Sequence, residues 1–141
     1  MAEHFVSVKL LLIDGADNAL VLRRGASHPR RPHQLDLPGG LAEAGEPMHK
    51  ALAREVLEET GLHIDSNNLR LLYAVTDEYD YGVFVRTTFG LRVPGVMPTV
   101  TVSWEHEAYE WKPVTELASV DCGAQQRGIE MILEHKLWQL L

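Results

Sequence analysis

A run of glutamates between a proline and a glycine restricts the middle of this chain to one local structure. Proline favours the first turn of an α-helix and glycine the position after its last turn, so Pro47 and Gly61 predict a helix of about 13 residues. Glu55, Glu58 and Glu59 stand at i, i+3 and i+4 of this helix, which places three carboxylates on one face. Like charges so placed repel, at a cost of about 0.2–0.5 kcal/mol for each pair. The fold must leave this face to water or hold a cation against it.

The two interpretations of the acidic face have different precedents. Glutamate-rich faces are common on exposed helices, and Arg54, four residues before Glu58, offsets part of the repulsion. A bound divalent cation would remove the conflict, because Mg²⁺ prefers oxygen ligands and leaves its remaining coordination positions to water and phosphate groups. The three glutamates alone favour the solvated face.

The residues around the helix reverse that balance. A wider spacing pattern is defined by Gly40, Glu46, Arg54, Glu55, Val56, Glu58, Glu59, Gly61 and Leu62. At average residue usage, such a match should arise by chance with a probability on the order of one in a billion per start point. The joint spacing, and not the glutamates by themselves, therefore indicates a metal site.

Strand patterns surround the helix and favour a mixed sheet with helices packed on it, an α/β sandwich. A hairpin is expected at Val6–Leu12 with Ala19–Arg24, and two long strands at Leu69–Val75 and Val83–Val93. Three short strands are expected at Gln34–Leu37, Thr99–Ser103 and Tyr109–Lys112, and a closing helix at Ile129–Leu140. At 141 residues the chain fits one domain, residues 1–141.

The segment Gly40–Leu62 resembles the signature of the Nudix hydrolase family at every defining position. The order of the expected strands and helices is also similar to that family's fold. The resemblance implies an αβα sandwich with a mixed β-sheet, spanning the whole chain. It also implies Mg²⁺-dependent hydrolysis of a nucleoside diphosphate linked to another group, with a nucleoside triphosphate pyrophosphohydrolase as the leading activity and Mn²⁺ as an alternative ion.

Site residues carry over from the resemblance by position. Glu55, Glu58 and Glu59 resemble the metal-binding glutamates, with the carbonyl of Gly39 or Gly40 as a further oxygen ligand. Arg54 resembles the residue that orients them. Glu46 has two open interpretations: support of the loop and helix ends, as in the family, or an acid favoured by the helix dipole.

An acidic loop near the end of the chain offers one more ligand. Trp104-Glu105-His106 precedes a Tyr-x-Trp strand and resembles a late Glu-His loop of many Nudix members. Glu105 is expected to be a further metal ligand or the general base that activates water, with Glu55 the other candidate base. A loop simply exposed to solvent is the alternative.

Arginines and aromatic residues are candidates for substrate binding. Guanidinium groups match phosphate oxygens bidentately, so the candidates for the diphosphate are Arg23, Arg24, Arg30 and Arg31. For Arg30 and Arg31 an exposed basic loop is the alternative, and the residues alone favour it. Adjacent strand residues face opposite sides, so only one of Arg23 and Arg24 should reach the site. The candidates for a platform under the base, by position only, are Tyr73, Tyr79, Tyr81 and Phe84.

Composition narrows the range of expected binding partners. A net charge of −7 disfavours surfaces for RNA or anionic membranes, and leaves a small nucleotide as the expected substrate. The single cysteine, Cys122, fits a reducing, cytoplasmic setting and reads as a small core residue. The resemblance also allows a homodimer.

A second hypothesis from another class is a Nudix-fold binding or sensor domain that recognises a nucleotide without hydrolysing it. Such a domain would be expected to lose glutamates, and here Glu55, Glu58 and Glu59 are all present. Hydrolysis is therefore the preferred interpretation.

Overall fold

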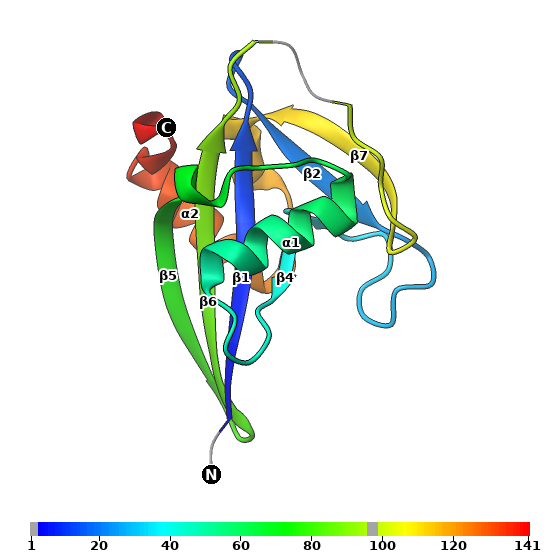
Figure 1. Cartoon of the computed structure of the whole chain (residues 1–141), viewed down its shortest axis with the longest axis vertical. Helices are drawn as coiled ribbons and strands as arrows, with labels where there is room; N and C mark the ends of the chain where they lie inside the picture. The colour runs from blue at the N-terminus through cyan, green and yellow to red at the C-terminus, as the bar shows by residue number, and fades with distance from the viewer. Residues whose placement is uncertain (1–2, 96–98) are drawn as a thin grey trace.

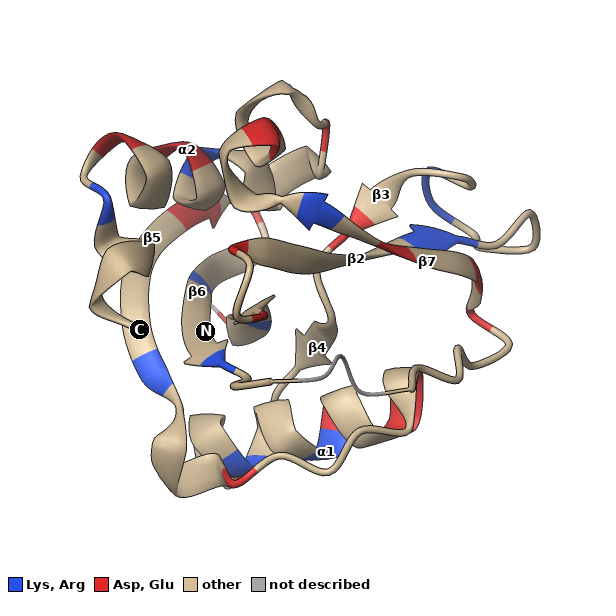
Figure 2. Cartoon of the chain, turned by 90° about the horizontal axis from the view of Figure 1, so that it is seen from above, with Lys and Arg blue, Asp and Glu red and all other residues tan. Residues whose placement is uncertain are grey.

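A mixed β-sheet lies between two helical layers in this computed structural model, which describes residues 3–95 and 99–141 (Figures 1 and 2). Within these residues the sheet has seven strands: β1 (Glu3–Ile13), β2 (Asn18–Arg24), β3 (Leu35–Asp36), β4 (Gly39–Leu41), β5 (Arg70–Tyr79), β6 (Gly82–Arg92) and β7 (His106–Pro113). The helices are α1 (Met48–Thr60) and α2 (Gln126–Glu134), with 3-10 turns η1 (Ser66–Asn68), η2 (Val114–Ser119), η3 (Gly123–Gln125) and η4 (Leu137–Leu140). The α/β sandwich expected from the sequence is confirmed.

The strand pairing opens the sheet in its middle. β1 runs parallel to β6 from Glu3↔Gly82 to Ile13↔Arg92, and β5 is antiparallel to β6. The expected hairpin of β1 and β2 pairs only at its turn, at Ile13↔Ala19. Beyond that point β4 pairs with β1, while β3 and β7 pair with β2. The two halves of the sheet therefore diverge, as Figure 2 shows.

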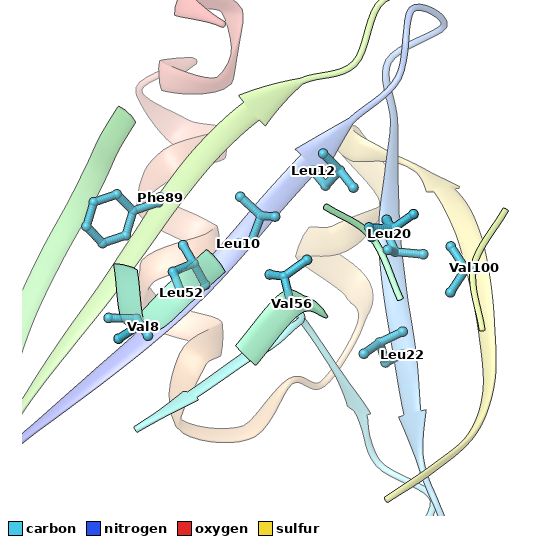
Figure 3. Packing of buried hydrophobic residues seen from close by; sticks show 11 residues of the cluster. Val8, Leu10, Leu12, Leu20, Leu22, Leu52, Val56, Phe89 and Val100 are labelled. Carbon is cyan, nitrogen blue, oxygen red and sulfur yellow. The ribbon is translucent and has the colours of Figure 1, made fainter. Parts of the chain in front are cut away.

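Alternation along β1 and β2 creates a core on each face of the sheet. Val8, Leu10 and Leu12 face α1, where they pack with Leu52 and Val56 (Figure 3). The alternate residues of β1 point to the opposite layer, where they join a second cluster. Its members are Leu11, Ile13, Ala19, Val21, Leu37, Val114, Leu117, Cys122, Ile129 and Ile132. The central strands are buried on both faces, and they fix the positions of everything attached to them.

Cys122 is one of the residues of the second core, as the sequence predicted. Its side chain is 2% exposed, and burial raises the pKa of its thiol to about 12. A thiol that stays protonated among apolar side chains packs as a small hydrophobic residue.

The α1 helix matches its prediction at both ends. Pro47 is its N-cap, and Gly61 takes the left-handed conformation that ends it, with φ of 72°. Ala51, Leu52 and Val56 form the fully buried stripe. This stripe packs α1 against the sheet, so the glutamate face of the helix is turned toward the opening between the strands.

Two predicted elements are wrong. The segment Thr99–Ser103 is not a strand, because its amides complete the end of α1 instead: Thr101 donates to the Thr60 carbonyl and Ser103 to the Glu59 carbonyl. The closing helix does not run through Leu140. It ends at Glu134, and Lys136, with φ of 53°, separates it from η4.

The described residues contain no helix that is both long enough and apolar enough to span a membrane.

One close approach joins β4 to β1. Gly39 has φ of 137°, and a Cβ there would lie 2.0 Å from the Val8 carbonyl oxygen. We expect Gly39→Ala to lower the free energy of unfolding by about 3 kcal/mol or more, from strain and overpacking against backbone. Gly45→Ala is the matched control, because Gly45 also has positive φ but open space around it, and should cost about 1 kcal/mol. Urea denaturation measures both, and equal losses would contradict the prediction.

Candidate functional site

A cleft of about 540 Å³ opens where β1 and β2 diverge, beside the glutamate face of α1. It is polar and charged, and every element around the opening contributes to its wall. The lining residues are Ser7, Lys9, Arg24, His28, Arg30, Asp36, Gly39, Gly40, Leu41, Glu55, Glu58, Glu59, Phe84, Arg86, Glu105 and His106. All the expected metal ligands are in this set.

The three helix glutamates lie at different depths. Glu59 is 6% exposed, and its Oε1 accepts a hydrogen bond of 2.7 Å from the Gly39 amide. Glu55 packs against Gly40, where an added Cβ would lie 2.7 Å from its carboxyl carbon. Glu58 is at the rim, with 58% of its side chain exposed. The two glycines thus make room for the carboxylates that the helix presents.

Burial changes the protonation of the deeper glutamates. Desolvation raises the pKa of Glu59 to about 8, although Lys9 and the Gly39 amide oppose the shift. Desolvation also raises the pKa of Glu55, with Arg54 opposing it. A bound cation would stabilise both carboxyl groups in their charged form, which is the form that binds a metal.

Arg54 connects the glutamates to the loop before the helix. It binds Glu46 bidentately, with Nε–Oε2 2.8 Å and Nη2–Oε1 2.9 Å, and its Nη1 donates to Glu55 at 3.1 Å. The same nitrogen is 3.4 Å from Glu58. Glu46 also accepts the Glu43 amide, and these bonds hold its pKa at about 2. Glu46 therefore supports the loop and the helix, which is the first of its two interpretations.

The donor set fits a hard divalent cation. Carboxylate oxygens and glycine carbonyls are the ligand types that Mg²⁺ prefers, and the cleft admits water and phosphate beside them. Among residues 3–95 and 99–141, no three side chains of acidic, histidine or cysteine type are gathered closely enough to hold an ion as they stand. Arg54 holds Glu55 and Glu58, and the Gly39 amide holds Glu59, in the positions described above.

Glu105 reaches the cleft through a loop that is fastened at both sides. The Ser103 amide donates to the Glu59 carbonyl, and the Gly25 amide donates to the Glu105 carbonyl at 2.9 Å. Next to it, His106 is 8% exposed, its Nδ1 has no partner among the described atoms, and burial lowers its pKa to about 4. The loop is thus held beside α1 and lines the cleft.

The four candidate arginines differ in whether they line the cleft. Arg24 lines the cleft, donating to Asp36 at 3.0 Å and to the Arg30 carbonyl at 3.1 Å. Arg23 points to a different pocket and donates to the His33 carbonyl. Arg30 lines the cleft with Arg24, whereas Arg31 lines only a neighbouring cavity. Arg24 is therefore the member of its pair that reaches the site.

Three charged cleft residues were not singled out from the sequence: Lys9, Asp36 and Arg86. The ammonium group of Lys9 donates to Asp36 Oδ2 at 3.0 Å and to the carbonyls of Leu37 and Gly39, each at 3.2 Å. A lysine inside the apolar pattern of β1 was the available signal. Its partners could not be identified, because Asp36 lies 27 positions away in the chain.

The buried ion pair of Lys9 gives a test of the site's framework. Lys9→Met should lower the free energy of unfolding by about 3 kcal/mol, because Asp36 and two carbonyls lose a donor where water is scarce. Lys112→Met is the matched control: its pair with Glu110 is more exposed and 3.5 Å long, so the loss should stay under about 1 kcal/mol. Denaturant unfolding of both variants decides, and a Lys9 variant as stable as the control would refute the expectation.

Comparison with known proteins adds the family context. A family model described as NUDIX domain matches residues 3–131. An ADP-ribose pyrophosphatase from Methanocaldococcus jannaschii is 34% identical over 79 residues, which cover 56% of this chain and 46% of that protein. The aligned part therefore spans about half the length of that relative.

Solved structures share the fold at low identity. The crystal structure of the MutT protein from Methanosarcina mazei Go1 matches with a TM-score of 0.77 and 24% identity, over 96% of each chain. The NUDIX domain of Shewanella oneidensis NrtR, crystallised with ADP ribose, matches with a TM-score of 0.75 and 15% identity, over 100% of this chain and 91% of that one.

Proposed function

This chain belongs to the NUDIX domain family, and from that premise we propose that it is a hydrolase of a phosphoanhydride bond in a nucleoside diphosphate linked to another group. The observation that carries the proposal is the cleft itself. It gathers the carboxylates of Glu55, Glu58, Glu59 and Glu105 and the guanidinium groups of Arg24 and Arg30 around one opening. This arrangement matches a metal-bound polyphosphate.

Five groups would hold the metal, with Mg²⁺ the proposed ion and Mn²⁺ the alternative. They are Glu55, Glu58, Glu59, Glu105 and the carbonyl of Gly39 or Gly40. When bound, the ion supplies charge neutralisation for the phosphate oxygens that otherwise repel an attacking water. Arg54 orients Glu55 and Glu58 through the contacts described above.

A general base completes the reaction by taking a proton from the attacking water, and Glu55 and Glu105 are the two candidates. The raised pKa of Glu55 supports the first, because a carboxylate with a higher pKa accepts a proton more readily. The place of Glu105 in the cleft wall, on a loop that hydrogen-bonds both to the end of α1 and to Gly25, supports the second.

Arg24 and Arg30 are the proposed phosphate ligands. Arg24 is held in place by Asp36 and by the backbone of Arg30, so its guanidinium is preorganised at the cleft wall. Lys9 has a different role, because its three donors are all committed to Asp36 and to carbonyl oxygens. Arg23 and Arg31 lie outside the cleft and are not assigned to the phosphates.

Nucleoside triphosphates are the substrates we propose first, with release of pyrophosphate. ADP-ribose is the second, because the relative from Methanocaldococcus jannaschii is named as an ADP-ribose pyrophosphatase. The net charge of −7 disfavours RNA ends.

A nucleotide panel with Mg²⁺ tests the activity. The parent should release pyrophosphate or phosphate from at least one nucleoside triphosphate or sugar nucleotide, and Glu58→Gln should lower kcat at least about a hundredfold, because a metal-binding carboxylate is lost. Glu130→Gln, on the exposed side of α2, is the control and should match the parent. Liberated phosphate is measured after treatment with inorganic pyrophosphatase.

The same panel separates the enzyme from a sensor domain. An intact protein that binds nucleotides but turns none over would support the sensor and end the enzymatic proposal. A Glu58→Gln variant as active as the parent would remove the proposed role of α1.

A second experiment assigns the metal ligands and the base. Removing divalent ions with EDTA should abolish turnover, and Mg²⁺ or Mn²⁺ should restore it. Free Mn²⁺, counted by electron paramagnetic resonance, should rise for a variant that loses a ligand. Between Glu55→Gln and Glu105→Gln, the variant of the base keeps most Mn²⁺ affinity yet loses about 10²–10⁴-fold in kcat at saturating metal. Full activity after EDTA treatment would contradict the metal requirement.

A further inference from the structure

The face of the sheet under α2 continues beyond the helix. Leu11 and Ile13 of β1 are covered by α2, whereas Phe5, three steps of the two-residue alternation before Leu11 on the same face, lies outside the second core cluster. The register places Phe84 beside Phe5 and Arg86 beside Ser7. Figure 1 shows β1, β5 and β6 running on past α2 toward the N-terminus. This uncovered part of the face carries aromatic rings around one arginine.

The guanidinium of Arg86 is fixed as a flat group over an aromatic ring. Its Cζ lies 4.6 Å from the centroid of Phe84, which itself stacks on Phe5 at 4.9 Å. Nε donates to Asp77 at 2.6 Å and Nη2 to the Tyr79 hydroxyl at 3.1 Å. Only 15% of the side chain is exposed. These bonds hold the guanidinium in one orientation, and a guanidinium plane held in this way can stack on a flat ring.

Arg86 stands where two cavities meet. A second cavity of about 320 Å³ adjoins the carboxylate cleft and is partly walled by Tyr79 and Tyr81. The two cavities share the residues Ser7, Lys9, Arg24, Arg30, Asp36, Phe84 and Arg86. A ligand with phosphates at the carboxylates can therefore extend past Arg86 toward the aromatic residues.

Resting on the proposed function, we propose that Arg86, supported by Phe84, is the platform on which the base of the nucleotide substrate stacks. Every nucleobase has a π-face, and guanidinium planes and aromatic rings stack on it with little dependence on sequence. The fixed geometry of Arg86 means that little side-chain freedom is lost on binding. Arg86 is thus a specificity residue that favours substrates with a base.

Nucleoside monophosphates are the probes, because they have a base and a phosphate but no anhydride bond. Titration calorimetry of the whole protein with AMP, GMP, CMP and UMP is compared with ribose 5-phosphate, in the presence of Mg²⁺. We expect the best monophosphate to bind at least about tenfold more tightly than ribose 5-phosphate. Arg86→Met should weaken that monophosphate about tenfold and leave ribose 5-phosphate unchanged.

Two further variants control for folding and charge. Arg92→Met removes another ion-paired arginine of β6, which contacts Asp17 and lines neither cavity, and it should leave both affinities as in the parent. Arg86→Lys keeps the charge but loses the plane, so it should bind like Arg86→Met. Circular dichroism and thermal melting show that each variant is folded.

Several results would overturn the proposal. They are an equal loss of affinity for monophosphates and ribose 5-phosphate in Arg86→Met, recovery in Arg86→Lys, an unchanged affinity in both, or no binding of any monophosphate by the parent. These outcomes are independent of hydrolysis. The expected binding pattern without any turnover would contradict only the proposed function. Turnover by the parent, with nucleotide affinity unchanged by Arg86→Met, would contradict only the role of Arg86.

Discussion

The contact between Gly39 and β1 is the constraint on which the site depends. The Val8 carbonyl occupies the place that a side chain at Gly39 would need, so the two backbones meet directly. From there the Gly39 amide donates to Glu59 and its carbonyl accepts the Lys9 ammonium. One residue without a side chain thereby fixes a strand, a buried carboxylate and a buried lysine relative to one another. Together with the buried stripe of α1, this contact positions the acidic face of the helix beside the cleft.

Charged groups of both signs give the cleft its chemistry. Carboxylates from α1 and the Glu105 loop line it together with Arg24 and Arg30, although the whole chain carries a net charge of −7. Buried charges of this kind are retained only when they are paired or when a ligand completes them. Asp36 pairs with both Lys9 and Arg24, and Arg54 is shared among the glutamates. The negative charges of Glu55 and Glu59 are not fully compensated, because burial raises the pKa values of both carboxyl groups.

Local signals predicted what local forces determine. The limits of α1 follow from Pro47 and Gly61, and the two faces of β1 follow from its alternation, so both were available from the sequence. Pairing over long distances was not available. The Gly-Gly-Leu segment of β4 has no strand propensity and is a strand only because β1 accepts it. Thr99–Ser103 has that propensity, yet its amides are used by the end of α1.

The residues proposed to contact the rest of the substrate could not be predicted from the sequence, for a related reason. The spacing from Gly40 to Leu62 describes one helix and its loop, a single stretch of chain that carries Glu55, Glu58 and Glu59, three of the proposed metal-binding groups. The second cavity is instead assembled from several strands, among them β1, β5 and β6, from the loop at Arg30 and Arg31 and from the residues around η3. Arg86 acquires its place through the register that sets it opposite Ser7 and sets Phe84 opposite Phe5. Because the reacting groups and the groups that choose the substrate sit on different elements, the second set can change while the first is kept.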